Sequence, residues 1–306
     1  MLNKDRILIR CIKEICKENG ISYEFFAFDW IAKLTLKRDM FIFGYQFPVN
    51  DAVADCICKD KSATYELLTK SGLNAVEHHY FTSPKWHHYT GNYDDETRLN
   101  GLLITHNKLV LKPNEGTGGR DVFFVNTVKE LDVARNNIFK KCEAMAVSPF
   151  YNISEEYRCI VYDDKVRIIY RKVRPTVTGD GKSKIIELMK ERNIKITCDD
   201  YIIDLNCVPE SGVDVILTLK HNLCSGAYAN SDIDLAVKNK IEQLAINAVK
   251  VIKIRFSSVD IIEVDGELKI LEINSGVMAE KYAAQSNEHY IAIKDVYKDV
   301  ILDYLL

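Results

Sequence analysis

Apolar and polar positions along this chain follow helical and strand periods in turn. Between residues 4 and 19 apolar side chains recur every three or four positions up to Gly20, which predicts an amphipathic helix and its end. The segment ISYEFFAF that follows has the composition of a strand. A second helix is predicted in KSATYELLTKSG, with Asp60 as its N-cap and Gly72 as its stop. Residues 83–107 are rich in polar, aromatic and turn-forming side chains, so we expect an irregular connection there.

From residue 108 the alternation sharpens. KLVLK, VFFV and AMAVSPF predict strands, and TVKELDVARNNIFKK predicts a helix before the last of them. Residues 105–149 are therefore expected to form a small α/β lobe, too short to stand alone. Residues 150–306 alternate long strands with helices near 183–193, 232–252 and 290–305, which indicates a larger lobe with a mixed sheet covered on one side. With residues 1–104 as a short N-terminal region and helical linker, the expected class is α+β.

A hairpin is predicted near the C-terminal end of the large lobe. The dipeptide Asp265-Gly266 lies between two apolar runs, DIIEV and ELKILEI, and is a strong turn signal. A two-residue loop would pair Ile262 with Lys269, whereas a three-residue loop pairs Ile262 with Ile270 and Glu263 with Lys269. We expect the three-residue loop, because it pairs charge with charge and apolar with apolar.

The same register predicts an oxygen-rich face on this hairpin. It places Asp260 opposite Glu272, with Asn274 two residues further on the same face. Two carboxylates and an amide oxygen are hard ligands that suit Mg²⁺ or Mn²⁺, especially where phosphate oxygens complete the shell. The alternative is an edge hairpin with solvated acidic residues.

Composition narrows the class of protein. The chain has 306 residues, 47% apolar and 28% charged, so it can bury a large core. Its net charge is −3, and it has no long basic run or aromatic–basic stripe for nucleic acid. The N-terminal segment has no apolar stretch long enough for a signal peptide or a membrane span, so we expect a cytoplasmic protein. The nine cysteines are scattered without a CxxC pair, which favours buried free thiols over disulfides or zinc.

A glycine-rich segment, PNEGTGGRD, follows Lys112 at the end of a predicted strand. It lies between two strands and lacks both the GK[ST] of a P-loop and the GxGxxG of a dinucleotide-binding fold, so neither of those assignments holds. A glycine-rich hairpin can instead place backbone N–H groups against phosphate oxygens, since Gly116, Gly118 and Gly119 permit close approach. Lys112 would add a positive charge there. The alternative is a flexible turn beside a surface lysine.

These features occur together and in one order, and in that order the chain resembles the ATP-grasp superfamily. The resemblance spans about residues 55–280. It lies in Asp60-Lys61 at a helix start, Lys112 before the glycine-rich hairpin, Glu156-Tyr157-Arg158, and Asp260 with Glu272 and Asn274. Within the superfamily the chain is most similar to the ligase modules of cyanophycin synthetase and bifunctional glutathione synthetase. Two segments indicate this: RPTVTGDGK, from Arg174, followed by IIEL, and HNLCSG, from His221.

The resemblance implies an ATP-grasp fold, in which two α/β lobes grip ATP, and a role for each matched position. The implied nucleotide-binding residues are Lys61 and Lys112 for the phosphates, the loop residues Gly116, Thr117, Gly118 and Gly119, Ser148 and Phe150 at an adenine-binding hinge, and Glu156 for the ribose. Asp260, Glu272 and Asn274 are the implied metal ligands. Arg174, with Asn222 nearby, is the implied catalytic group that steadies the transferring phosphoryl group. The alternative is that the arginines are solvated strand-face charges and that Glu156 pairs with one of them.

The activity that the resemblance implies is ATP-dependent ligation of a carboxylate to an amine. An acyl phosphate forms, the amine attacks it, and ADP and phosphate are released; phosphoryl transfer of this kind needs positioning and charge neutralisation and no protein nucleophile. The expected partners are small-molecule or peptide substrates, with ATP and Mg²⁺ or Mn²⁺, and neither nucleic acid nor a membrane. Two alternatives stay open: a kinase that phosphorylates a small acceptor, and a non-catalytic nucleotide-binding module. A homodimer is left open as well, because the region before the resemblance is short.

Two features lie outside this scheme. Asp121 stands where the related ligases have glycine, so either its carboxylate points away from the phosphates or the loop has another geometry. Four histidines, at positions 78, 79, 87 and 88, form two pairs in an aromatic region and raise the question of zinc. No cysteine or acidic residue frames them at a recurring metal spacing, so we do not favour a zinc site.

Overall fold

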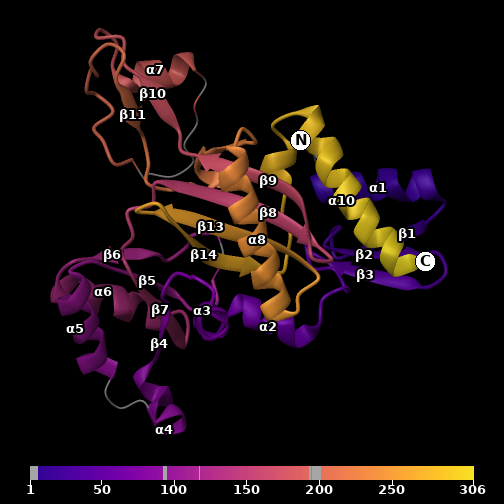
Figure 1. The fold of residues 1–306 in the computed structure, drawn as a ribbon, viewed down its shortest axis with the longest axis horizontal. Coiled ribbons are helices and arrows are strands. Elements are labelled where there is room, and N and C mark those ends of the chain that lie inside the picture. The colour runs from indigo at the N-terminus through magenta and orange to yellow at the C-terminus, as the bar shows by residue number, and fades with distance from the viewer. Residues whose placement is uncertain (1–5, 92–94, 117, 193, 195–200) are drawn as a thin grey trace.

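The computed structural model describes residues 6–91, 95–116, 118–192, 194 and 201–306. In this part of the chain the strands form sheets of three, four, five and two strands, and neighbouring strands in every sheet are antiparallel. Figure 1 shows the five-stranded sheet at the centre, with the four-stranded sheet below it and the three-stranded sheet beside α10. No helix in the described ranges is both long and apolar enough to cross a membrane.

The N-terminal part consists of one helix and a small sheet. Helix α1 (Ile7–Asn19) ends at Gly20, whose φ of 66° is left-handed, as the sequence predicts. The expected single strand is β1 (Ser22–Phe26), but β2 (Ile31–Thr35) and β3 (Asp39–Phe43) follow it and complete a sheet. Alternate residues of β2 and β3 are buried against α1 and α10 (Asn287–Leu305).

The four-stranded sheet has the order β4-β7-β5-β6. Its strands are β4 (His79–Thr82), β5 (Leu109–Pro113), β6 (Phe123–Val125) and β7 (Ala144–Pro149), and α6 (Val128–Phe139) packs on it; the last three strands and the helix confirm the sequence prediction. The irregular connection expected over 83–107 is wrong, because η1 (Pro84–Trp86), α4 (His87–Thr90) and α5 (Asp95–His106) lie there. Leu99 and Leu103 of α5 are buried against this sheet, which explains its helical order.

The five-stranded sheet has the order β12-β9-β8-β13-β14. Its strands are β8 (Glu155–Tyr162), β9 (Lys165–Val173), β12 (Tyr228–Asn230), β13 (Phe256–Val264) and β14 (Glu267–Asn274). One face packs on α8 (Leu235–Ile252), α2 (Ala52–Lys59) and α3 (Lys61–Lys70), and the other on α10 and α1. The expected mixed sheet covered on one side is therefore wrong: this sheet is antiparallel and has helices on both faces (Figure 1).

Alternation along β8 divides its side chains between these two faces. Cys159 and Val161 belong to the core under α8, whereas Ile160 and Tyr162 belong to the core under α10. The next residue on the α10 side is Arg158, so the apolar face becomes charged where α10 no longer covers it. This charged half of the sheet face positions the candidate site.

The β13–β14 hairpin differs from prediction near its turn and agrees with it further away. Asp265 and Gly266 have φ values of 51° and 79° and form a two-residue turn, so Ile262 pairs with Lys269 and the expected three-residue loop is wrong. The register then shifts by one residue at Leu271, a β-bulge, and Asp260 lies opposite Glu272 as predicted. The bulge allows Ile270 and Ile273, three positions apart, to enter the same core under α8.

A small unit projects from the end of β9. It contains β10 (Thr176–Thr178), α7 (Ile185–Glu191) and β11 (Asp214–Ile216), around its own cluster of buried apolar residues that includes Val177 and Leu188 (Figure 1). The short helices η2 (Leu223–Ser225) and α9 (Glu280–Ala283) complete the described elements. The cysteines in the described ranges are free thiols, of which Cys56, Cys207 and Cys224 are exposed; Cys198 lies outside the described residues.

Candidate functional site

Four charged side chains lie together on the half of the sheet face that α10 does not cover. Arg158 donates through Nε and Nη2 to the two carboxylate oxygens of Asp260, at 2.7 and 2.6 Å. Lys172 reaches Asp260 Oδ2 at 3.0 Å and also donates to Glu156. Asp260 is 1% exposed and Lys172 4%, so this is a buried network. It comes from three adjacent strands, β8, β9 and β13.

Asp260 and Lys172 stay ionised because opposite charges in the network compensate for their burial. Burial by itself raises the pKa of Asp260, but the charges of Arg158 and Lys172 outweigh it and hold that pKa well below its ordinary value. Burial and Arg158 lower the pKa of Lys172, while Asp260 and Glu156 raise it, and the pKa ends above its ordinary value. Removing one member would therefore leave an uncompensated buried charge.

Lys172 is not among the residues predicted from the sequence, where Arg174 is the expected catalytic cation. Lys172 continues the face that holds Ile168 and Tyr170, and that alternation was the available signal. The alternative that Glu156 pairs with an arginine is wrong, since it pairs with Lys172. Nor is Arg158 a solvated strand-face charge, because its partner Asp260 is buried.

The expected metal ligands lie on one face, but they differ in how far protein groups already occupy their oxygens. Glu272 and Asn274 are joined by a 3.1 Å hydrogen bond from Asn274 Nδ2 to Glu272 Oε1, which leaves the Asn274 carbonyl oxygen for a cation. Asp260 already accepts from Arg158 and Lys172. The described residues include no group of three or more histidine, cysteine or acidic side chains arranged to hold a metal. The carboxylate and amide oxygens nevertheless fit a hard cation such as Mg²⁺.

Two lysines come from the other side of the site, where burial lowers the pKa of both and the negative charge of Glu272 opposes that lowering. Lys61, at the start of α3, is buried, and its Nζ donates to the carbonyl oxygens of Asn114 and Gly116 at 3.2 and 2.7 Å. It thus fastens the start of the glycine-rich loop to α3. Burial lowers the pKa of Lys112, on β5, to about 8, against the opposing effect of Glu272.

The glycine-rich loop contains two glycines with left-handed backbone conformations. Gly118 and Gly119 have φ values of 72° and 69°, in the left-handed region. Thr117 lies outside the described residues. Asp121, the departure from the related ligases, pairs with Lys141 after α6 at 2.5 Å. That pair neutralises the carboxylate and directs it to Lys141.

The expected adenine-binding hinge is the end of β7. Ser148 is buried and pairs with Val110 of β5, and the N–H of Phe150 donates to the carbonyl oxygen of Lys108 at 3.0 Å. The ladder between β7 and β4 ends at Val147. Strand β7 therefore continues past Val147 with one neighbouring strand in the described ladder, which suits a segment that offers its backbone to a ligand.

The remaining candidates gather at the end of β9. His221 is buried, and its Nδ1 lies 2.9 Å from the carbonyl oxygen of Lys172. Asn222 caps η2, accepting from the N–H of Cys224 at 2.9 Å. Arg174 is half-buried just beyond β9. Burial lowers the pKa of His221, and the charge of Arg174 lowers it further, whereas the charge of Glu156 opposes this. Arg174 and the segment 221–224 thus border the buried network.

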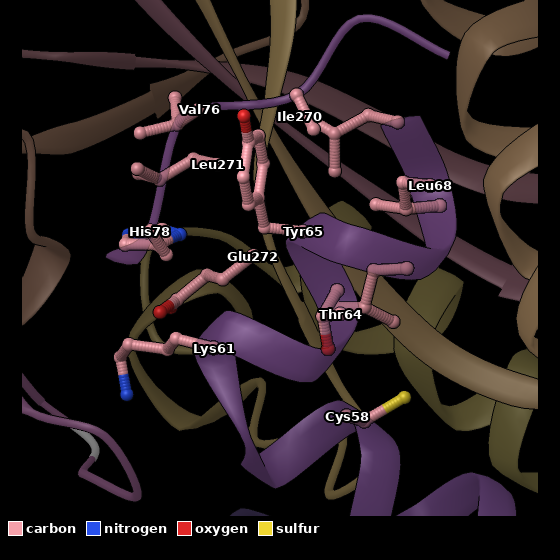
Figure 2. Close-up of a pocket in the computed structure, with 12 residues that line it drawn as sticks. Cys58, Lys61, Thr64, Tyr65, Leu68, Val76, His78, Ile270, Leu271 and Glu272 are labelled. Atoms are coloured by element: carbon pink, nitrogen blue, oxygen red, sulfur yellow. The ribbon is translucent and has the colours of Figure 1, made fainter. Parts of the chain in front are cut away.

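A pocket lies between the start of α3, which carries Lys61, and the bulged part of β14. Figure 2 shows Lys61, His78 and Glu272 on one side of it, and the apolar side chains of Leu68 and Ile270 on the other. Of the other histidines, His79 pairs with Glu77 at 3.2 Å and His87 with Asp95 at 3.4 Å. In the described ranges, His79 and His87 therefore contact different acidic residues.

Comparisons with known proteins add the wider context. No family model matches the chain. In sequence it is 25% identical over 255 residues to cyanophycin synthetase of Trichormus variabilis, covering 76% of this chain and 27% of that protein. It is 22% identical over 244 residues to the glutathione biosynthesis bifunctional protein GshAB of Enterococcus faecalis, covering 72% of this chain and 31% of that protein. The chain thus spans about a third or less of the length of these relatives.

The solved structures agree with the fold prediction. A bifunctional glutathione synthetase from Pasteurella multocida superposes with a TM-score of 0.59 and 17% identity, over 97% of this chain and 44% of that one. The VanG D-Ala:D-Ser ligase from Enterococcus faecalis gives 0.55 and 15%, over 84% and 65%. Both the predicted α+β class and the predicted resemblance are confirmed, and the chain has the fold of the ATP-grasp ligases.

Proposed function

We propose that this chain is an ATP-dependent ligase that joins a carboxylate to an amine and releases ADP and phosphate. The observation that supports this most directly is a set of charges contributed by α3 and two sheets: Lys61 and Lys112, on which the charge of Glu272 acts, beside the Arg158–Asp260–Lys172–Glu156 network. Such a site is suited to neutralising and orienting phosphates. In this proposal residues 105–149 and 150–306 act as the two lobes that grip the nucleotide.

Binding of ATP is assigned to residues on both sides of the site. Lys61 and Lys112 would neutralise the phosphates, and the N–H groups of the loop at Gly116–Gly119 would cover them. Ser148 and Phe150 would border the adenine, and Glu156 the ribose. Mg²⁺, held by Glu272 and Asn274 with Asp260, would supply positive charge to the β- and γ-phosphates. Asp260 serves this role through its fixed position, because Arg158 and Lys172 orient both of its oxygens.

The chemistry proceeds in two balanced steps. A carboxylate oxygen of the first substrate attacks the γ-phosphorus of ATP, the bond to the β-phosphate oxygen breaks, and ADP leaves. The amine nitrogen of the second substrate then attacks the acyl carbon, phosphate departs with its bonding electron pair, and the nitrogen loses a proton to the departing phosphate. Arg174, with Lys172 beside it and Asn222 nearby, would steady the negative oxygens during both steps.

The test is ADP release from Mg·ATP with amino acids and short peptides, supplied singly and in pairs, with mass detection of products. The panel starts from these compounds because the similar proteins are named for glutathione biosynthesis and for a D-Ala:D-Ser ligase. Turnover that requires an acid and an amine together, with a condensed product, is the expected result. A phosphorylated product from one acceptor alone would identify a kinase, and ATP binding without turnover over a broad panel would favour a nucleotide-binding module.

A further inference from the structure

His78 is a buried polar residue that the proposed reaction does not yet use. It precedes β4 and is 4% exposed. Its Nε2 is buried and has no hydrogen-bond partner among the described residues. Buried polar atoms are nearly always hydrogen-bonded, and one without a partner is costly. The unpaired nitrogen therefore calls for an explanation.

The surroundings of His78 are those of the proposed phosphate site. It lines the same pocket as Lys61 and Glu272, and Figure 2 shows these three side chains together along one side. Burial lowers the pKa of His78, and the charges of Lys112 and Lys61 lower it further, so both lysines act on this ring. Lys61 in turn holds the carbonyl of Gly116 in the glycine-rich loop. The imidazole thus belongs with the side chains expected to meet the nucleotide's phosphates.

The neighbouring histidine provides an internal contrast. His79 lies next in the chain, its side chain is 31% exposed, and it has a partner in Glu77. The two residues have the same chemistry and nearly the same sequence position. His78 is distinguished by its burial and by an Nε2 that has no partner in the part of the chain that the structure describes.

We propose that His78 is a nucleotide-positioning residue whose Nε2–H donates a hydrogen bond to a phosphate oxygen of ATP. An imidazole offers a donor at Nε2 both as that neutral tautomer and as the cation, so the contact does not depend on titration. The donor adds direction to the charge of Lys61 and Lys112, since a ring nitrogen fixes the approach of one oxygen more narrowly than a flexible ammonium group does. This inference rests on the proposed function, because it takes ATP as the ligand.

The experiment measures the dissociation constants of ATP and adenosine by calorimetry, with Mg²⁺ and without acceptor substrates. His78→Leu removes the donor, His78→Gln keeps an amide donor of similar reach, and His79→Leu is the matched control. For His78→Leu we expect ATP to bind about tenfold to a hundredfold more weakly, as for loss of a hydrogen bond to a charged group. Adenosine should bind as it does to wild type, His78→Gln should recover much of the loss, and His79→Leu should bind ATP like wild type.

Each of the other outcomes would contradict one part of the proposal. Unchanged ATP affinity in His78→Leu, or an equal loss for adenosine and ATP, would overturn the phosphate contact while leaving the proposed function standing. A Gln variant as weak as the Leu variant would overturn the hydrogen bond. Failure of the wild-type protein to bind ATP would overturn the proposed function and this inference with it. Thermal unfolding without ligand verifies that each variant is folded.

Discussion

One face of the five-stranded sheet has two halves with opposite character. Under α10, Ile160, Tyr162 and Phe256 pack in an apolar core. Further along the same strands and on the same face, Arg158 and Asp260 form part of an ionised network. The apolar half is stabilised by area removed from water, whereas the charged half is stable only while its members remain paired. The contrast shows that one set of strands supplies both the rigid support and the reactive surface.

We expect the largest loss of stability and activity from a substitution that removes a member of the charged network. Asp260→Ala leaves Arg158 and Lys172 buried without their shared partner, so we expect a loss of about 3–5 kcal/mol in the free energy of unfolding together with loss of ADP release. Urea denaturation and the ADP assay measure the two effects. Asp299→Ala, which removes an exposed partner of Arg167, is the control and should cost about 0–1 kcal/mol. An Asp260 variant as stable as this control would contradict the buried network.

Glu272→Gln separates activity from stability within the charged half. Glu272 hydrogen-bonds to Asn274 and faces the lysines, but it lies outside the Arg158–Asp260 pair. The amide keeps the size of the side chain and removes its charge, so we expect turnover to be abolished while the urea midpoint changes little. Unchanged ADP release from the variant would refute the metal-site proposal.

Phe256→Ala tests the apolar half. Phe256 is fully buried and meets Phe47 and Tyr162 edge to face, with ring centroids 5.1 and 5.9 Å apart. Its truncation should cost about 3–5 kcal/mol of folding stability, and ADP release per folded molecule should stay near the wild-type value at low temperature. If folded protein instead loses turnover as Glu272→Gln does, the two halves do not act independently.

The smallest expected effect is a change in how folding stability depends on pH. The pKa of Lys112 is about 8 in the folded chain and 10.5 ordinarily, so the unfolded chain binds more protons between these values and stability should rise with pH there. Below pH 8 both states are protonated and the full penalty is present. Lys112→Met removes it, so the variant should be more stable than wild type at pH 7 and show a shallower rise between pH 8 and 10. Parallel stability curves for the two proteins would rule out this burial penalty.

The sequence predicted the elements of the site better than their contacts. Asp60 as a helix cap follows from a local pattern, and the structure agrees. Asp260 lies opposite Glu272 as predicted, but through the bulge and not through the expected three-residue loop. The burial of Lys61 depends on contacts with Asn114 and Gly116, more than fifty residues away, which no local pattern reveals. The bulge had a visible signal, because Ile270 and Ile273 are three apart and cannot share a face of a regular strand.

The bulge at Leu271 marks a position at which the hairpin can change length without changing which residues pair beyond it. A strand shortened by this one residue would return to a regular ladder from the turn onward, with Glu272 still opposite Asp260 and Asn274 still opposite Ser258. What the additional residue contributes is Leu271 itself, which joins Glu272 in the wall of the pocket that His78 also lines. The length of this strand can therefore vary at one point and reshape the pocket while the order of the carboxylates stays the same.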